Sequence, residues 1–180
     1  NPIAFATPRQ DGKPSLVIDM SLSKVARGKV MAAAKAGENI PEGWAISAEG
    51  NPTTDPIEAL AGSMVPTGDA KGAALALMIE ILSATLIGAN HSYDATSFFE
   101  AEGDPPGVGQ FIIAIDANRV GGSNFIKRIE NLICAILSQS GSRLPGEKRI
   151  ISRNQCKRNG ILVPPHILQE IEDLGKQIKL

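Results

Sequence analysis

The sequence predicts a fold in which strands are mixed with helices, of the α/β or α+β class, on three observations. Two short apolar runs, residues 3–6 and 16–18, flank a turn that contains an Asp-Gly pair, which predicts an antiparallel hairpin. The continuous apolar run QFIIAI at residues 110–115 predicts a strand buried on both faces. Apolar side chains recur at helical spacing in residues 124–139. The opening hairpin argues against a purely parallel sheet.

After the hairpin, the sequence predicts one helix and one ordered loop. Ser23 is a suitable N-cap for a helix over residues 24–36, and Gly37 is a suitable residue to end it. Residues 38–55 are rich in Gly, Pro, Asn and Thr, which is typical of a loop. The single tryptophan, Trp44, lies in this loop, and we expect it to anchor the loop to the core.

A short helix and a long apolar segment come next. Asp55-Pro56 predicts a helix that reaches to about residue 60, since proline is favoured in a first turn. Residues 72–89 (GAALALMIEILSATLIGA) approach the length of a membrane span, but an ionised Glu80 at the centre would be costly in lipid. We therefore expect no membrane partner and a helix buried inside the protein. A buried carboxylate needs a partner, and we expect a basic or hydroxyl side chain to reach Glu80.

The remaining segments predict mostly helix. Residues 90–107 are expected to form a loop, and residues 144–148 a turn. A basic helix is expected over residues 149–160, then a short strand at 161–163 and a closing amphipathic helix over 165–177.

Composition excludes several classes of function. The chain has 18 basic and 19 acidic residues, a balance that argues against a nucleic-acid partner. Cys134 and Cys156 fit neither a zinc spacing nor a disulfide framework, so we expect no metal site and a reducing, cytoplasmic location. No secretory signal is visible. Because the sequence opens at Asn1 within a strand-like run, we expect a C-terminal portion of a longer chain or a shortened polypeptide.

Familiar catalytic signatures are missing from the sequence. It contains no GxGxxG after a strand, no GxxxxGK[ST], no HExxH and no GxSxG. His91 lies in a polar loop, and His166 lies at the start of the last predicted helix. Neither has a serine or cysteine partner in the sequence that would indicate a nucleophilic relay, so we assign neither as the catalytic acid.

Three polar spots end or begin apolar elements and are candidate ligand contacts. Asp19 and its neighbours end a strand, where a carboxylate can accept hydrogen bonds from ribose hydroxyls; the alternative is that Asp19 only caps the next turn. Lys71 adds its charge to the positive end of a helix, which favours an anionic ligand; alternatively it extends into water. In the turn at Gly146, the glycine lets backbone approach a ligand, although most such turns are only turns.

Five motifs occur along the chain in a characteristic order. They are NPIAFATP at residues 1–8, VIDMSLSKVARG at 17–28, AEGNPTTD at 48–55, Lys71-Gly72 before an apolar helix, and RLPGE at 143–147. Together they resemble the type-2 malate/L-lactate dehydrogenase family, and the resemblance covers essentially the whole chain. Members of this family include ureidoglycolate, sulfolactate and 2,3-diketogulonate enzymes and a reductase of cyclic imino acids.

The resemblance implies a mixed, largely antiparallel sheet flanked by helices, which is not a Rossmann fold, and it implies a homodimer. It also implies NAD or NADP as the cofactor. The family's catalytic histidine lies upstream of Asn1, so no catalytic residue is assigned in this chain. The implied cofactor contacts are Ile18, Asp19, Met20, Ser21, Ala70, Lys71, Gly146, Glu147 and Lys148.

The function implied by the resemblance is an NAD(P)H-dependent oxidoreductase that interconverts a 2-oxo acid and a 2-hydroxy acid. Residues 1–148 are expected to form the dinucleotide-binding region. Residues 149–180 are expected to form a helical segment that packs on the N-terminal part of the same enzyme, and the 180-residue segment alone is expected to be inactive. The alternative is a non-catalytic interaction module with no dinucleotide site, in which Asp19, Lys71 and Glu147 are ordinary surface charges.

Overall fold

The computed structural model describes residues 2–99 and 103–177, and the chain forms two compact units. One unit consists of residues 1–7 and 17–125, and the other of residues 8–16 and 126–180. The division between the units therefore falls within the opening hairpin, whose turn belongs to the second unit.

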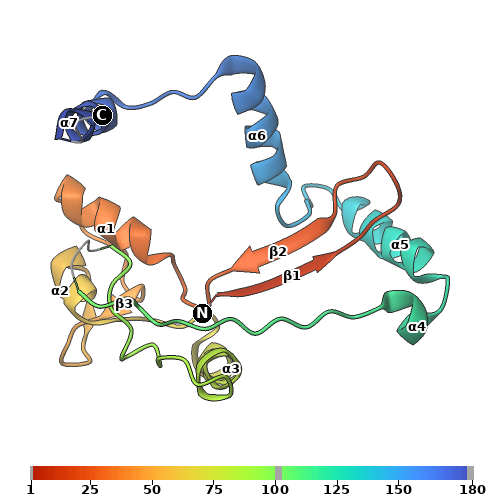
Figure 1. The fold of residues 1–180 in the computed structure, drawn as a ribbon, viewed down its shortest axis with the longest axis horizontal. Helices are drawn as coiled ribbons and strands as arrows, with labels where there is room; N and C mark the ends of the chain where they lie inside the picture. Colours follow the sequence, from red (N-terminus) through yellow and green to blue (C-terminus); the bar gives the residue numbers. More distant parts are fainter. Residues whose placement is uncertain (1, 100–102, 178–180) are drawn as a thin grey trace. The chain divides into compact units, whose positions relative to one another are not determined.

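The opening hairpin is present as predicted. β1 (Ile3–Thr7) and β2 (Leu16–Met20) form a two-stranded sheet and run in opposite directions (Figure 1). The connecting turn contains Gly12 at φ 80°, a left-handed conformation that glycine adopts without steric cost. The Asp-Gly signal therefore located this turn correctly.

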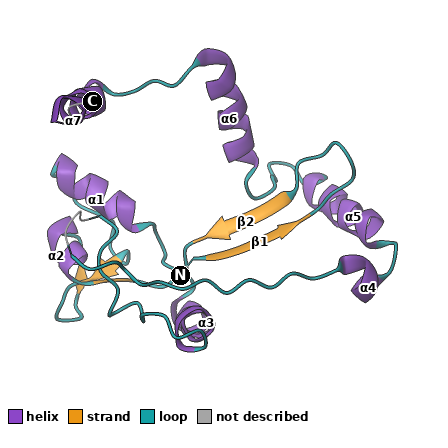
Figure 2. Cartoon of the chain, in the orientation of Figure 1, coloured by secondary structure: helices purple, strands orange, loops and turns teal. Residues whose placement is uncertain are grey.

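A small antiparallel sheet lies where a loop was expected. β3 (Ala45–Ile46) is central and pairs with β4 (Pro52–Thr53) on one side and β5 (Ser63–Met64) on the other. Strands of two residues have no apolar alternation for a sequence to reveal, so the loop prediction for residues 38–55 missed two of the three. The predicted mixed class is confirmed, since short antiparallel sheets are combined with helices (Figure 2).

The first unit has its core between this sheet and two helices. α1 (Arg27–Ala36) and α2 (Pro56–Ala61) contact one another, and α2 also contacts all three strands. Trp44 packs against this core, as expected from the sequence. The buried side chains of the cluster are Val25, Val30, Ile40, Ala45 and Ala59.

The caps of these two helices differ from one another. The Asp55 carboxylate accepts hydrogen bonds from the Ile57 and Glu58 N–H groups at 2.7 and 3.4 Å, which confirms the predicted start of α2. The predicted cap of α1 is wrong: the Ser23 hydroxyl donates to the Val25 carbonyl at 2.8 Å, and α1 begins three residues later than expected. Local hydrogen bonding of a serine to nearby backbone competes with capping.

The long apolar helix is interrupted and mostly exposed, so the prediction of one buried helix over residues 72–89 is wrong. α3 (Asp69–Glu80) passes into the π-helical turn η1 (Ile81–Thr85), where the Leu86 N–H donates to the Ile81 carbonyl. Within these two elements only Gly72 and Ala84 are buried. In the described ranges, no helix is both long and apolar enough to cross a membrane.

The environment of Glu80 also differs from the prediction. Its side chain is half-buried rather than buried, and Oε1 accepts a hydrogen bond from the Ser92 backbone N–H at 2.7 Å. A backbone donor thus takes the place of the expected basic or hydroxyl side chain. The π-turn lies between these two residues in the sequence, so their contact could not be anticipated from helical spacing.

Two predicted strands are absent from the described part of the chain. Residues 110–115 and 161–163 carry no strand assignment, and Figure 2 draws both segments as loop. Strand formation needs a neighbouring strand, and neither segment has one here. A short helix that the sequence analysis missed, α4 (Ala117–Gly121), follows the first of these segments; the Asp116 carboxylate caps it.

The second unit combines the hairpin turn, residues 8–16, with three helices. These are α5 (Phe125–Leu137), whose first residue belongs to the first unit, α6 (Glu147–Asn159), which carries the predicted basic sequence, and the closing helix α7 (Pro165–Gln177). All three helices begin or end within two residues of their predicted bounds. Ile133 on α5 is 1% exposed and provides the buried apolar contact of that helix.

Candidate functional site

The end of β2 is joined by backbone hydrogen bonds to the segment that leads into α3. The Thr67 N–H donates to the Leu22 carbonyl at 2.8 Å, and the Lys24 N–H donates to the Val65 carbonyl at 2.8 Å. An antiparallel bridge pairs the residues between them. This ladder brings two of the three predicted spots together, although they are about fifty residues apart in the sequence.

The turn that opens α3 is tightly folded. Gly68, the residue before the helix, has φ 69° and ψ 26°, and Asp69 has φ 52°, a conformation that non-glycine residues adopt at a cost. A Cβ at Gly72 would lie 1.5 Å from the Thr67 carbonyl oxygen, so only glycine fits there. Backbone N–H groups at such turns and at helix N-termini form concave sites for anions.

Lys71 and Ala70 lie in the first turn of α3 and are both exposed. No side chain caps this helix end. Among the described residues, no carboxylate lies within ion-pair distance of the Lys71 ammonium. A cation at the positive end of a helix dipole is locally unfavourable, and a bound anion would offset that cost.

The β2 side of the site provides polar groups at the point where the strand ends. Ile18 is half-buried, whereas Asp19 and Met20, the last residues of β2, are exposed. Ser21 is half-buried, and its Oγ lies 3.0 Å from the Oγ of Ser23. A carboxylate, two hydroxyls and a helix N-terminus therefore belong to one connected stretch of structure, which is the chemistry suited to a ribose and its phosphate.

The third predicted spot lies in the second unit, as the turn that opens α6. Gly146 has φ 80° and precedes the helix, and Lys148 is exposed. The Glu147 carboxylate accepts a hydrogen bond from the Leu144 N–H at 3.3 Å, so Glu147 stabilises its own turn. This contact matches the alternative in which the motif is only a turn. A contact between this turn and a ligand remains a prediction.

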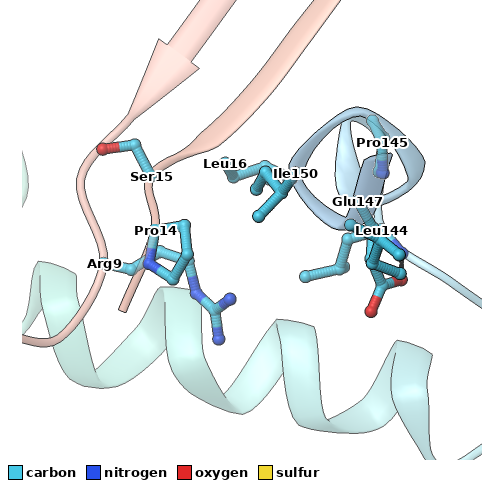
Figure 3. Close-up of a pocket in the computed structure, with 9 residues that line it drawn as sticks. Arg9, Pro14, Ser15, Leu16, Leu144, Pro145, Glu147 and Ile150 are labelled. Carbon is cyan, nitrogen blue, oxygen red and sulfur yellow. Dashed lines mark hydrogen bonds between the residues drawn. The ribbon is translucent and has the colours of Figure 1, made fainter. Parts of the chain in front are cut away.

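A pocket of about 230 Å³ lies beside this turn in the second unit (Figure 3). Residues on the hairpin turn line one side, and residues around the start of α6 line the other. Most of its surface is apolar, with Arg9 and Glu147 as charged groups at the lining. The lining residues are Arg9, Pro14, Ser15, Leu16, Leu144, Pro145, Glu147, Ile150 and Ile151.

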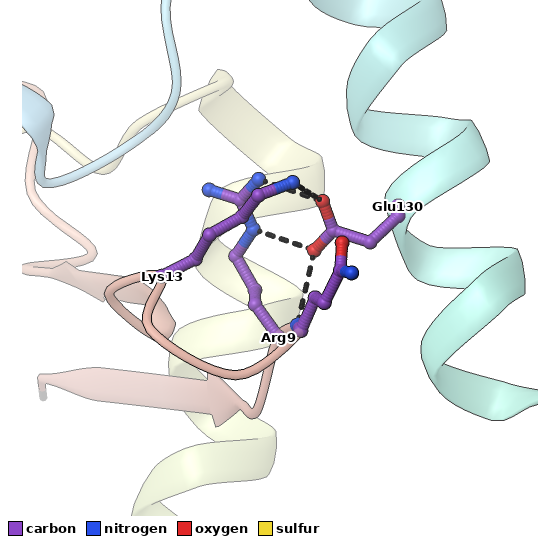
Figure 4. Close-up of polar contacts among 4 residues, drawn as sticks. Arg9, Lys13 and Glu130 are labelled. Carbon is purple, nitrogen blue, oxygen red and sulfur yellow. Dashed lines mark hydrogen bonds and ion pairs between the residues drawn. The ribbon is translucent and has the colours of Figure 1, made fainter.

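Arg9 is held in place by Glu130 of α5, an interaction that the sequence analysis missed (Figure 4). The Glu130 carboxylate accepts from Arg9 Nε and Nη2 at 3.0 Å each, from Lys13 Nζ at 2.7 Å, and from the Gln10 N–H at 3.3 Å. The hydrogen bonds from Arg9, which have the largest effect, and from Lys13 lower the pKa of Glu130 to about 2. The contact joins residues more than one hundred positions apart, and no local pattern signals it.

His91 is surrounded by polar partners that the sequence did not reveal. Its Nε2 lies 3.0 Å from Thr85 Oγ1, and its ring stacks on Tyr93 with centroids 5.3 Å apart. Asp94 Oδ2 lies 3.8 Å from Nδ1. Thr85 is the last residue of η1, so this contact joins the π-turn to the loop that follows it. Within the described residues, no three His, Cys, Asp or Glu side chains are grouped as metal ligands would be.

Comparison with known proteins gives the family. The sequence model described as malate/L-lactate dehydrogenase matches residues 1–172, and the chain belongs to this family. It is 54% identical over 171 residues to the (2R)-3-sulfolactate dehydrogenase (NADP(+)) of Chromohalobacter salexigens. It is 39% identical over 178 residues to a Delta(1)-pyrroline-2-carboxylate reductase of Ancylobacter novellus. These alignments cover 95% and 97% of this chain, but 50% and 52% of the relatives.

Solved structures agree with this assignment. The delta1-piperideine-2-carboxylate reductase of Pseudomonas syringae superposes with a TM-score of 0.82 at 34% identity, covering 96% of this chain and 52% of the reductase. The sulfolactate dehydrogenase of Methanocaldococcus jannaschii superposes with a TM-score of 0.78 at 32% identity, covering 99% of this chain and 52% of the dehydrogenase. The chain thus spans about half the length of the relatives it matches, and the mixed α/β fold class expected from the sequence is confirmed.

Proposed function

We propose that this chain is the dinucleotide-binding portion of an NAD(P)-dependent oxidoreductase that interconverts a 2-oxo acid and a 2-hydroxy acid. The observation that carries the proposal is the ladder between residues 22–24 and 65–67, which joins the polar end of β2 to the N-terminus of α3. Family membership supports the reaction class, and the name of the 54% identical relative supports NADP as one of the two cofactors.

The residues fit a phosphorylated ribose in three respects. The left-handed Gly68 and Asp69 shape a turn at a helix N-terminus, and Gly72 keeps that turn free of side-chain atoms. Lys71 supplies a cation that has no ion-pair partner in the described part of the chain. Asp19 and Ser21 supply an acceptor and a hydroxyl on the adjoining segment.

The bound cofactor would supply a hydride at nicotinamide C4 to substrate C2. In this proposal, Ile18, Asp19, Met20 and Ser21 orient the dinucleotide, and Ala70 and Lys71 hold its phosphate side. Gly146, Glu147 and Lys148 form a further contact. We place the acid that protonates the substrate oxygen, or the nitrogen of an imine, outside residues 1–180. We give His91 no catalytic part, because the resemblance places the family's catalytic histidine upstream of Asn1.

Replacement of Lys71 tests the cofactor assignment. Lys71→Ala removes a charge-assisted hydrogen bond, so we expect NADPH or NADH to bind roughly 10- to 150-fold more weakly, measured by nicotinamide fluorescence on titration. Lys35→Ala, which removes an exposed lysine at the far end of α1, is the matched control and should leave affinity unchanged. Equal affinities for the wild type and both variants would contradict the assignment. Absence of dinucleotide binding to an assembly that also contains the remaining half of the enzyme would favour the interaction module.

The remaining parts of the proposal concern assembly and location. We propose a homodimer, as the resemblance implies, and a cytoplasmic location, which the two free thiols, Cys134 and Cys156, support. The functional division at residue 148 also remains a proposal. The compact units follow a different boundary, because they are defined by packing rather than by ligand contacts.

A further inference from the structure

Residues 110–115 have the sequence of a strand and no partner. The described hydrogen bonds include none made by the backbone of these residues, and their side chains are largely exposed. Phe111, Ile112, Ile113 and Ile115 are 43, 83, 68 and 70% exposed. A run of six residues without proline or charge, with unpaired backbone, is an aggregation hazard that proteins normally cover.

The segment is nevertheless held at its N-terminal end. On its N-terminal side, the Asn90 N–H donates to the Gly107 carbonyl at 3.0 Å. A Cβ at Gly109 would lie 2.4 Å from the Ser83 carbonyl oxygen, so the backbone passes close against the π-turn. On its C-terminal side, Asp116 caps α4. Fixing this end lowers the entropy lost when a partner strand binds, because the start of the segment is already positioned.

The apolar pattern indicates an interior strand rather than an edge. In an extended chain Phe111, Ile113 and Ile115 share one face. Ile112 and Ala114 share the other with Gln110, so both faces are mainly apolar. Strands with two apolar faces occur where both faces are covered. A second copy of this chain, paired edge to edge with the same segment, would cover one edge and leave the other edge and the faces open.

The relatives contain enough additional chain to complete the pairing. The match to the P. syringae reductase covers 96% of this chain but 52% of that protein, so nearly half of that protein has no counterpart here. We propose that residues 110–115 form a β-strand when they pair with a strand from the half of this fold that the relatives carry and this chain does not span.

Hydrogen exchange tests the proposal. The 180-residue chain is co-expressed with the half of the C. salexigens sulfolactate dehydrogenase that it does not match, and amide exchange is followed by mass spectrometry. We expect the amides of residues 110–115 to exchange at near-unprotected rates in the chain alone and at least about 100-fold more slowly in the complex. Ile113→Pro removes one N–H and should reduce recovery of the complex, whereas Ile113→Val should not.

Three results would overturn the proposal. The two polypeptides could fail to associate, or associate while residues 110–115 remain unprotected. The chain alone could acquire protection that increases with its own concentration, which would make a second copy the partner. None of these measurements involves a dinucleotide, so they are independent of the proposed function.

Discussion

Gly72→Ala is expected to destabilise the first unit, although alanine is the better helix former. The new Cβ would lie 1.5 Å from the Thr67 carbonyl oxygen, whereas real Cβ contacts essentially never fall below 3.0 Å. The Thr67–Gly72 turn must therefore open by at least about 1.5 Å, because the obstacle is backbone and cannot rotate away. Opening this turn also strains the hydrogen bond from Thr67 to Leu22 that joins α3 to the end of β2.

The magnitude follows from opposing contributions. Overpacking of this kind costs about 1–3 kcal/mol, and loss of a backbone hydrogen bond costs about 1 kcal/mol more. Replacing glycine by alanine in a helix returns about 1 kcal/mol. We therefore expect a net loss of about 2 kcal/mol in the free energy of unfolding, measured by urea titration with Trp44 fluorescence as the probe.

The matched control is Gly28→Ala in α1. No atom lies within 4 Å of the Cβ it would add, and Gly28 has no left-handed φ. The same substitution should there stabilise the protein by up to about 1 kcal/mol. The reasoning is refuted if Gly72→Ala is as stable as the wild type, or if both variants change stability in the same direction.

Two further predictions concern stability. Because the pKa of Glu130 is lowered from 4.5 to about 2, its ionised carboxylate stabilises the folded second unit above pH 4.5, and this stabilisation is lost as the pH falls toward 2. Glu130→Gln should therefore destabilise the second unit at pH 6 and much less at pH 2, as measured by urea titration followed by far-UV circular dichroism. The control Glu172→Gln, on exposed α7, should unfold like the wild type at both pH values. Asp55→Ala should lower the free energy of unfolding by about 1 kcal/mol, because the α2 cap is lost, whereas Asp55→Asn should keep most of the stability that the cap provides. Equal losses for the two variants in Trp44-monitored unfolding would exclude capping as the cause.

The sequence predicted features that depend on neighbouring residues. The Asp-Gly turn of the hairpin, the helix start at Asp55-Pro56 and the three C-terminal helices are all encoded within a few positions, and the structure contains them. The two-residue strands β3, β4 and β5 and the π-turn after Glu80 carry no periodic signal, so the pattern could not indicate them. For residues 110–115 the apolar pattern indicated a preference for strand, whereas a strand forms only when a neighbouring strand pairs with it.

The candidate site likewise combines residues that the local sequence indicated with long-range contacts that it did not. Asp19 and Lys71 stood out because each follows or precedes an apolar element. The ladder between residues 22–24 and 65–67, which brings their segments together, is a long-range contact that no local pattern contains. The clamp of Arg9 and Lys13 on Glu130 was missed for the same reason.

The central claim is that the end of β2 and the N-terminus of α3 hold one dinucleotide together. The most direct measurement is a ¹⁵N-resolved NMR titration of the 180-residue chain with NADPH and, separately, NADH. Our account predicts saturable shifts of the amides of residues 18–21 and of residues 70–71 with a common dissociation constant. Saturable binding that leaves both segments unshifted, or shifts that titrate with different constants at the two segments, would contradict it.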